Sequence, residues 1–310
     1  MHVELNYKMI DQPELKEIES KAIEIASNAG ELLLQYFDKP LSVDYKSANG
    51  RNPVTDADHA ADELIRKEIS KYFPSHTTVT EETENTSNEI GQFTWVVDPL
   101  DGTTNFLHGL PIFASMLCLL LNGIPVVSAV YLPKIGSAKG TIYHASHGGG
   151  TFENNIPVRL DNSEQGRLMA SVPGYFLRMF NYHKSLRRKL GDIRSLGSAG
   201  FELVMTAKGT TDYMVSSGPR VWDIAPGLLL ILEAGGAALV RNKNTRNWEN
   251  FESFCSSPNI DPSPEELRDW KETLILGKPY AVEKIASGLS VRSYPLRSLR
   301  NKINAMTKHF

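Results

Sequence analysis

Hydrophobic residues recur at intervals of three and four in several parts of the chain, a spacing typical of amphipathic helices. The pattern predicts helices over residues 12–37, 55–73, 198–208 and 223–234. The basic stretch 181–190 is also predicted to be helical. The first two helices have clear boundaries, because Pro13 suits a first turn, Thr55 or Asp56 can cap the second helix, and Pro74 ends it.

Short apolar runs separated by turn residues predict strands between residues 112 and 160. The runs 113–121 and 124–132 flank Asn122-Gly123, which is the strongest short signal for a hairpin. The antiparallel meander is predicted to continue over residues 141–145 and 151–160, with Asn154-Asn155 as a further turn, and another strand is predicted over residues 168–172. Residues 241–269 are polar and contain three prolines, so they are predicted to form an insertion or a long surface loop.

These elements predict an α+β protein in which helices and antiparallel sheets form layers. A boundary near residues 160–162 would separate an N-terminal half, residues 1–161, from a C-terminal half, residues 162–310. The two halves are expected to form one catalytic unit.

The composition excludes several classes of protein. A chain of 310 residues with 41% hydrophobic and 22% charged residues is ordinary for a globular protein, and its net charge of −3 makes nucleic-acid binding an unlikely role. The longest apolar stretches, 113–121 and 224–232, are too short to span a membrane, and the N-terminus lacks the pattern of a signal peptide. With only two cysteines, a reducing, cytoplasmic setting is expected.

The most informative chemistry follows the apolar run at residues 95–97. Pro99 cannot donate to a strand ladder, so the strand is predicted to stop there. Asp98, the Leu100 carbonyl and Asp101 then offer three oxygens within four residues, which suits a hard cation such as Mg²⁺. Gly102 and Thr103 follow where backbone N–H groups favour an anion.

More distant acidic residues are expected to join this site. Glu81 and Glu82 follow a predicted strand, Asp223 begins a predicted helix, and Asp56 begins another. Two metal ions held by this many carboxylates can activate water and stabilise a leaving oxygen. Asp58 and Asp62 are interpreted instead as solvated charges on a helix face.

Residues 98–106, with the sequence DPLDGTTNF, resemble the signature of the inositol monophosphatase family of Mg²⁺-dependent, lithium-sensitive phosphatases. Residues 222–225, WDIA, are similar to the second motif of that family. Glu81, Asp56 and Lys46 stand in the matching order, and the resemblance covers roughly residues 12–240. It implies an alternating α/β/α/β/α sandwich, a homodimer, and a hydrolase that uses two or three Mg²⁺ ions on a small phosphorylated metabolite.

The resemblance also implies roles for single residues. Glu81 and Thr103 would orient the attacking water, and Asp56 would act through metal-bound water or near Thr103. The backbone amides of Gly102 and Thr103 would hold the phosphate. The implied metal ligands are Glu81, Asp98, the Leu100 carbonyl, Asp101 and Asp223, and the substrate's alcohol part would lie beside Gly197, Ser198, Ala199, Ser216 and Asp223.

The substrate stays open at this stage. Ser216 stands where the family's inositol phosphatases place an acidic residue, and a serine recognises hydroxyls more weakly than a carboxylate. A small polyol or sugar phosphate is the leading expectation. Fructose 1,6-bisphosphate, histidinol phosphate and 3′-phosphoadenosine 5′-phosphate are the alternatives. A regulatory protein-binding module is the alternative from another class, and the basic residues 291–310 are the feature that favours it.

Overall fold

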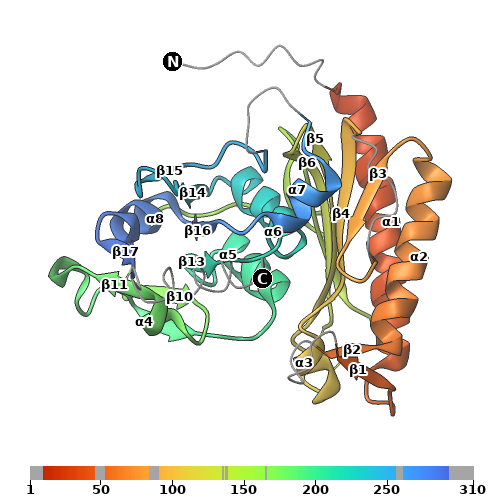
Figure 1. Ribbon diagram of the computed structural model, residues 1–310, viewed down its shortest axis with the longest axis horizontal. Helices are drawn as coiled ribbons and strands as arrows, with labels where there is room; N and C mark the ends of the chain where they lie inside the picture. Colours follow the sequence, from red (N-terminus) through yellow and green to blue (C-terminus); the bar gives the residue numbers. More distant parts are fainter. Residues whose placement is uncertain are drawn as a thin grey trace, which may run out of the picture.

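Two β-sheets organise the molecule (Figure 1). The computed structural model describes residues 10–45, 53–83, 91–134, 136, 139–164, 166–255 and 261–292. In these residues the larger sheet has seven strands in sequence order: β3 (Thr77–Thr80), β4 (Phe93–Asp101), β5 (Ala114–Leu121), β6 (Ile124–Leu132), β7 (Thr141–Ser146), β8 (Gly150–Glu153) and β9 (Ile156–Val158). β3 and β4 are parallel, and every later pair is antiparallel, as the predicted meander requires.

The smaller sheet has six strands and a mixed topology. β10 runs parallel to both β12 and β13, whereas β16 is antiparallel to β13 and β14. The strand order is β12 (Asp192–Arg194), β10 (Met169–Ser171), β13 (Tyr213–Ser217), β16 (Thr273–Gly277), β14 (Ala237–Arg241) and β15 (Trp248–Asn250). The two sheets therefore use separate stretches of chain, and the predicted division into halves at residues 161 and 162 falls between them and stays a prediction.

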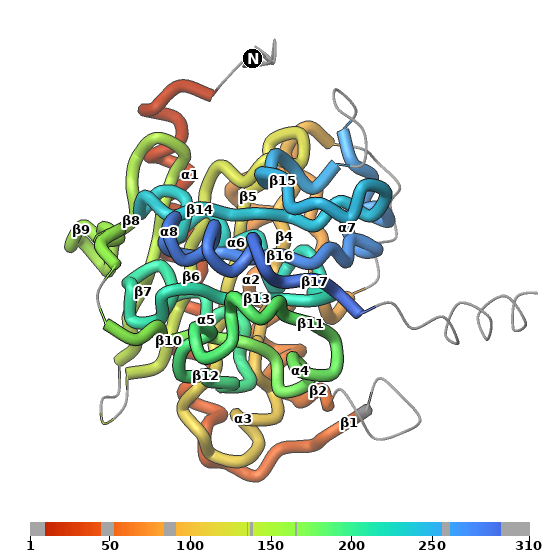
Figure 2. The backbone as a smooth tube through the Cα atoms, turned by 90° about the vertical axis from the view of Figure 1, so that its left-hand side faces the viewer, coloured from red at the N-terminus to blue at the C-terminus, as the bar shows by residue number. Residues whose placement is uncertain are grey.

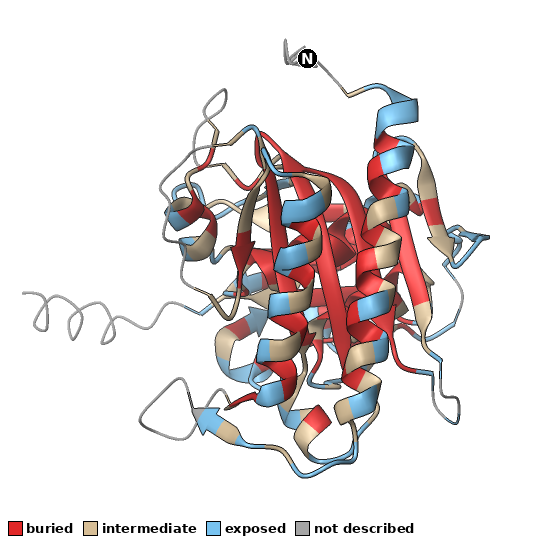
Figure 3. Cartoon of the chain, turned by 90° about the vertical axis from the view of Figure 1, so that its right-hand side faces the viewer, coloured by how far each residue is buried: buried red, intermediate tan, exposed pale blue. Residues whose placement is uncertain are grey.

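Helices α1 (Gln12–Tyr36) and α2 (Asp56–Tyr72) cover the outer face of the larger sheet (Figure 3). Their apolar stripes pack on the sheet, as with Ile25 of α1 and Ile65 of α2 against Trp95 and Leu117, while the opposite faces are exposed. The helical spacing of hydrophobic residues predicted both helices to within one residue at each end. Ahead of α2, the short strands β1 (Val43–Tyr45) and β2 (Pro53–Thr55) form a hairpin.

Helices α5 (Ala199–Ala207) and α6 (Val221–Glu233) lie between the two sheets (Figure 1). α6 is buried along most of its length, because it meets the larger sheet on one side and the smaller sheet on the other. The helices approach closely at Gly227, where an added Cβ would lie 2.3 Å from Cβ of Leu203. Glycine is therefore required for this packing distance.

The outer face of the smaller sheet carries the fifth layer. Helix α8 (Pro279–Ala286) packs there beside α4 (Phe176–Met179) and the antiparallel pair β11 (Phe180–Tyr182) and β17 (Leu289–Val291) (Figure 2). The order of layers is thus α/β/α/β/α, and the predicted fold class is confirmed.

Several predicted elements are wrong. Residues 181–190 contain the last two residues of strand β11 and a 3₁₀ turn, Lys184–Leu186, because Asn181 and Tyr182 pair with β17 and the positive φ of Arg188 is incompatible with a right-handed helix. By contrast, the turn predicted at Asn154-Asn155 within residues 151–160 is confirmed, and it joins β8 to β9. Residues 241–269 are not one long loop, since they include β15 and helix α7 (Pro264–Asp269) and bury Phe254 and Leu267.

Candidate active site

Strand β4 delivers the first acidic residues through an irregularity in its pairing. Asp98 pairs with Met116 and Asp101 with Ala114, so β4 has one more residue than β5 in this interval. The prediction that the strand ends at Pro99 is wrong, because the extra residue forms a bulge that takes proline without loss of a ladder hydrogen bond. The bulge holds Asp98, Leu100 and Asp101 at one end of the sheet.

Three carboxylates from different elements meet at this end. Glu81 follows β3, Asp98 lies in β4 and Asp223 lies in the first turn of α6, and each offers an oxygen within 4.8 Å of the others. Oδ1 of Asp98 is buried and makes no hydrogen bond with the described residues. A buried carboxylate oxygen without a partner requires an explanation, and a cation supplies one. The donor set consists only of oxygens, which fits a hard divalent cation such as Mg²⁺.

The acidic cluster is electrostatically strained without a cation. Burial, followed by the negative charge of Glu81, raises the pKa of Asp98 well above its ordinary value. Burial likewise raises the pKa of Asp223 to about 8, against the hydrogen bond from the backbone of Arg220. Burial raises the pKa of Asp101 to about 6, while its hydrogen bonds oppose the shift. Positive charge among these groups would favour their ionised forms.

Asp101 connects β4 to helix α5. Its carboxylate accepts hydrogen bonds from the backbone N–H groups of Ala199 at 3.0 Å and Gly200 at 2.8 Å, and from the hydroxyl of Ser198. The same hydroxyl caps α5 by accepting from the N–H of Phe201. These bonds pin the loop that contains Gly197 and Ala199 against the carboxylates of β4.

Thr103 lies just beyond the bulge, in the short helix α3 (Thr103–Leu107). Its hydroxyl is within hydrogen-bond distance of two acceptors, Oδ1 of Asp58 at 3.2 Å and the carbonyl of Leu100 at 3.1 Å. The hydrogen-bond partner of Thr103 is thus Asp58, whereas the expected role of Asp56, near Thr103 or through metal-bound water, stays a prediction. Asp56 is exposed and accepts from the N–H of Ser42, because Asp58 is the residue that α2 turns inward.

The three converging carboxylates and Thr103 line an open cleft of about 280 Å³. Gly102 begins α3 with φ 87°, and a Cβ there would lie 3.0 Å from both the Ile112 carbonyl and Cβ of Ser198. Glycine therefore lets the backbone pass between these groups. The cleft is lined by Pro53, Glu81, Asp98, Leu100, Asp101, Gly102, Thr103, Thr104, Gly197, Ala199 and Asp223.

The predicted alcohol-binding residues do not all face the cleft. Gly197 and Ala199 line it, whereas Ser198 is 1% exposed and directs its hydroxyl to Asp101. Ser216 lies near the end of β13, outside the cleft lining. Beside it, the backbone carbonyl of Ser217 accepts a hydrogen bond from the hydroxyl of Tyr175.

Comparison with known proteins identifies the family. A profile of the inositol monophosphatase family matches residues 14–273. The chain belongs to this family. An inositol-1-monophosphatase of Mesorhizobium japonicum is 34% identical over 223 residues, which are 69% of this chain and 82% of that protein. The Nus factor SuhB of Escherichia coli K12 is 32% identical over 222 residues, with 69% and 82% covered.

The fold agrees with this family. The crystal structure of extragenic suppressor protein suhB from Bartonella henselae matches with a TM-score of 0.68 at 27% identity, covering 87% of this chain and 97% of that one. As a member of the inositol monophosphatase family, the chain is a phosphoric monoester hydrolase, and the predicted family and enzyme class are confirmed. The family is metal-dependent and acts on small phosphorylated substrates. Among the described residues, every helix is too short or too polar to cross a bilayer.

In this family member, three polar residues near the site escaped the sequence analysis. Asp58 is fully buried and Asp62 is 2% exposed, so their interpretation as solvated charges is wrong. The sequence does carry a signal for Asp58, because residues 55–58, TDAD, fit a capping box. In the structure, the side chains of Thr55 and Asp58 each accept a hydrogen bond from the backbone N–H of the other residue. Tyr175 has no such signal. Lys46 lies outside the described residues.

Proposed function

We propose that this chain is a Mg²⁺-dependent phosphomonoesterase that hydrolyses a small polyol or sugar phosphate by attack of an activated water. The convergence of Glu81, Asp98 and Asp223 within 4.8 Å carries the proposal, together with Oδ1 of Asp98, which has no hydrogen-bond partner in the part of the chain that the structure describes. The Leu100 carbonyl and Asp101 complete the proposed ligand set for two or three ions. Bound there, Mg²⁺ would supply activation of the attacking water and neutralise charge on the leaving oxygen.

The protein's own part in the reaction is to position water and phosphate. Because Asp58 and the Leu100 carbonyl compete for the Thr103 hydroxyl proton, the lone pairs of Oγ1 remain available to a water in the cleft. Glu81, which lines the same cleft, is the proposed acceptor of a proton from that water. The backbone N–H groups of Gly102 and Thr103 are the proposed donors to the phosphate oxygens.

The residues near the proposed substrate position favour a ligand whose hydroxyl groups are recognised without a carboxylate at position 216. Tyr175 is 46% exposed, and its pKa is raised by partial burial and then by the charge of Asp223, so the ring lies within electrostatic range of the site. Tyr175 and Ser216 lie beside the cleft rather than in its lining, and both side chains are neutral and carry a hydroxyl. A sugar phosphate, or a polyol phosphate other than inositol phosphate, is therefore the preferred physiological substrate.

Phosphate release from a panel of phosphorylated metabolites tests the proposal. The panel includes inositol monophosphate, fructose 1,6-bisphosphate, histidinol phosphate and 3′-phosphoadenosine 5′-phosphate, each with Mg²⁺ and with EDTA. Release that needs Mg²⁺, is lost in Asp98→Asn and is kept in the exposed control Asp161→Asn supports it. No release from any member by folded wild-type protein contradicts it.

A protein-binding role is the second candidate, because the Escherichia coli relative is named a Nus factor. Deletion of residues 293–310 separates the two functions and spares Arg292, whose side chain donates to the Phe180 carbonyl. A phosphatase keeps its turnover in this variant, whereas a protein-binding module that uses the basic segment loses its partner. A homodimer, inhibition by Li⁺ and a cytoplasmic location remain part of the proposal, and light scattering tests the first.

A further inference from the structure

Helix α7 lies in the stretch that the sequence presented as a surface insertion, yet it reaches the acidic cluster. The guanidinium of Arg268, near the end of α7, donates a hydrogen bond through Nη2 to the carbonyl of Thr83. Thr83 is two residues from Glu81 along the chain. Its N–H donates to the Thr80 hydroxyl at 3.1 Å and its own hydroxyl to Asp62 at 2.7 Å. Arg268 therefore adds an anchor to the segment that carries Glu81.

The same residue also contacts the segment that carries Asp223. The carbonyl of Arg268 accepts a hydrogen bond from Nη1 of Arg220, and the N–H of Arg220 donates to Oδ2 of Asp223 at 2.8 Å. The Arg268 guanidinium carbon lies 5.5 Å from the ring centroid of Trp222, the neighbour of Asp223. Arg268 thus joins the end of β3, in the larger sheet, to the start of α6, between the sheets.

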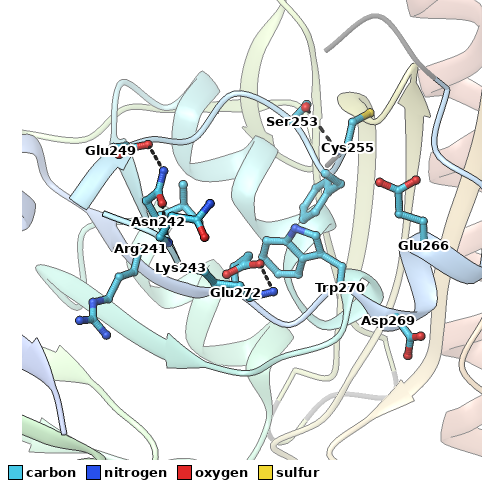
Figure 4. Close-up of a pocket in the computed structure, with 13 residues that line it drawn as sticks. Arg241, Asn242, Lys243, Glu249, Ser253, Cys255, Glu266, Asp269, Trp270 and Glu272 are labelled. Carbon is cyan, nitrogen blue, oxygen red and sulfur yellow. Dashed lines mark hydrogen bonds and ion pairs between the residues drawn. The ribbon is translucent and has the colours of Figure 1, made fainter. Parts of the chain in front are cut away.

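The residue that follows α7, Trp270, belongs to an aromatic cluster beside the pocket shown in Figure 4, which Trp270 and Cys255 help to line. The ring of Trp270 packs edge-on against Phe254 at 4.8 Å, and Phe254 packs against Phe251 at 4.9 Å. The N–H of Phe254 donates to the carbonyl of Gly123, in the turn between β5 and β6. Because this aromatic cluster ties α7 to the larger sheet, the position of Arg268 is determined by packing rather than by a mobile loop.

We propose that Arg268 is a positioning residue that holds Glu81 and Asp223 at the separation needed to bind a divalent cation. This inference rests on the proposed function, since it takes both carboxylates as metal ligands. Carboxylates brought this close repel each other, so a fixed link between their segments is needed to keep the site assembled before the cation binds. Groups that orient metal ligands in this way typically change metal affinity about 10- to 100-fold when removed.

Calorimetric titration of the full-length protein with Mn²⁺ tests this role without relying on activity. Arg268→Met removes the charge and the hydrogen bond to Thr83, while it keeps an unbranched apolar stem and the backbone carbonyl that accepts from Arg220. Its Mn²⁺ dissociation constant is expected to rise at least about tenfold. Arg268→Lys keeps the positive charge and a donating ammonium group on a shorter side chain, so it is expected to recover part of the loss. The matched control is Arg241→Met, because Arg241 donates to the Arg246 carbonyl of its own hairpin.

The outcomes distinguish this inference from the proposed function. If wild type binds Mn²⁺ and folded Arg268→Met binds it equally well, the side chain of Arg268 has no positioning role and the proposed function is untouched. If wild type binds no divalent cation, both ideas fail. Should Arg268→Met not fold, Arg220→Met cuts the other link. Weaker Mn²⁺ binding by that variant supports the inference, and unchanged binding overturns it.

Discussion

The hydroxyl of Thr103 lies 3.2 Å from Oδ1 of Asp58, which is 45 residues earlier in the chain. This contact joins α3, at the end of the metal-binding strand, to the first turn of α2. The other oxygen of Asp58 accepts from the N–H and the hydroxyl of Thr55, at 2.8 and 2.5 Å. A single buried carboxylate therefore caps a helix and orients the threonine proposed to hold the attacking water.

Asp58→Asn is expected to lower kcat by at least about 100-fold, the usual scale for losing a group that directs proton transfer. An amide at this position accepts only through one oxygen, so it satisfies either Thr55 or Thr103. Asp56→Asn, on the exposed face two residues earlier, is the matched comparison and is expected to change kcat by no more than about twofold. Steady-state phosphate release measures both. If Asp56→Asn lowered kcat more than Asp58→Asn, Asp56 rather than Asp58 would be the residue that supports Thr103.

Ser198→Ala tests the link between Asp101 and α5. The variant loses the cap on Phe201 and the hydroxyl bond to Asp101, so unfolding is expected to become easier by about 1 kcal/mol. The KM for the phosphorylated substrate is expected to rise roughly tenfold, because Asp101 and the Gly197–Ala199 loop lose a shared anchor. Asp11→Ala removes a comparable cap from α1, on the far side of the larger sheet. It should cost similar stability in urea unfolding with an unchanged KM, and a KM effect as large as that of Ser198→Ala would refute the proposed link.

Metal removal should destabilise the protein more at higher pH. The pKa values of Asp101 and Asp223 are raised to about 6 and about 8, so the folded state keeps protons that the unfolded state has already lost. Their contribution to stability is therefore present at low pH and is lost as the pH rises through these values. In EDTA, the unfolding temperature should be lower near pH 8 than near pH 6. Saturating Mg²⁺ should raise the unfolding temperature most near pH 8.

Asp98→Asn is the control for this experiment, since it removes one ionised ligand. In this variant, Mg²⁺ should raise the unfolding temperature less than in wild type at both pH values. If Mg²⁺ raises the unfolding temperature equally in wild type and in the variant, the stabilising cation binds elsewhere on the protein.

His76 should make stability fall as the pH drops. Burial lowers the pKa of this histidine to about 4, and its Nδ1 faces the indole N–H of Trp95 at 3.1 Å. The unfolded chain then binds a proton below the ordinary histidine pKa of 6.5 while the folded state does not. Stability from this group is full above that value and is lost as the pH falls toward 4. Urea unfolding of wild type and His76→Gln over this range isolates the effect, and identical pH slopes would exclude it.

Much of the fold followed from local pattern. The three- and four-residue spacing predicted α1, α2, α5 and α6, and Asn122-Gly123 predicted the β5–β6 hairpin, because helix faces and tight turns depend on neighbouring residues alone. The arrangement DPLDGTTNF also brought Asp98 and Asp101 to a strand end, since the motif is contained within β4 and the start of α3.

The spacing of hydrophobic residues did not predict the structure where contacts between distant segments determine it. Asn181 and Tyr182 pair with a strand more than 100 residues later, and the aromatic cluster around Phe254 folds residues 241–269 onto the larger sheet. No local periodicity signals either arrangement, because the partners of these segments are distant in sequence.

The sequence by itself determined the family, the helices that flank the site and the acidic residues available to a cation. Only the tertiary structure decided that Asp58 rather than Asp56 meets Thr103, that Ser198 faces Asp101, and that Arg268 reaches Thr83. The reason is physical: a motif specifies which chemical groups are present, whereas burial and hydrogen bonding between distant segments determine which of them meet.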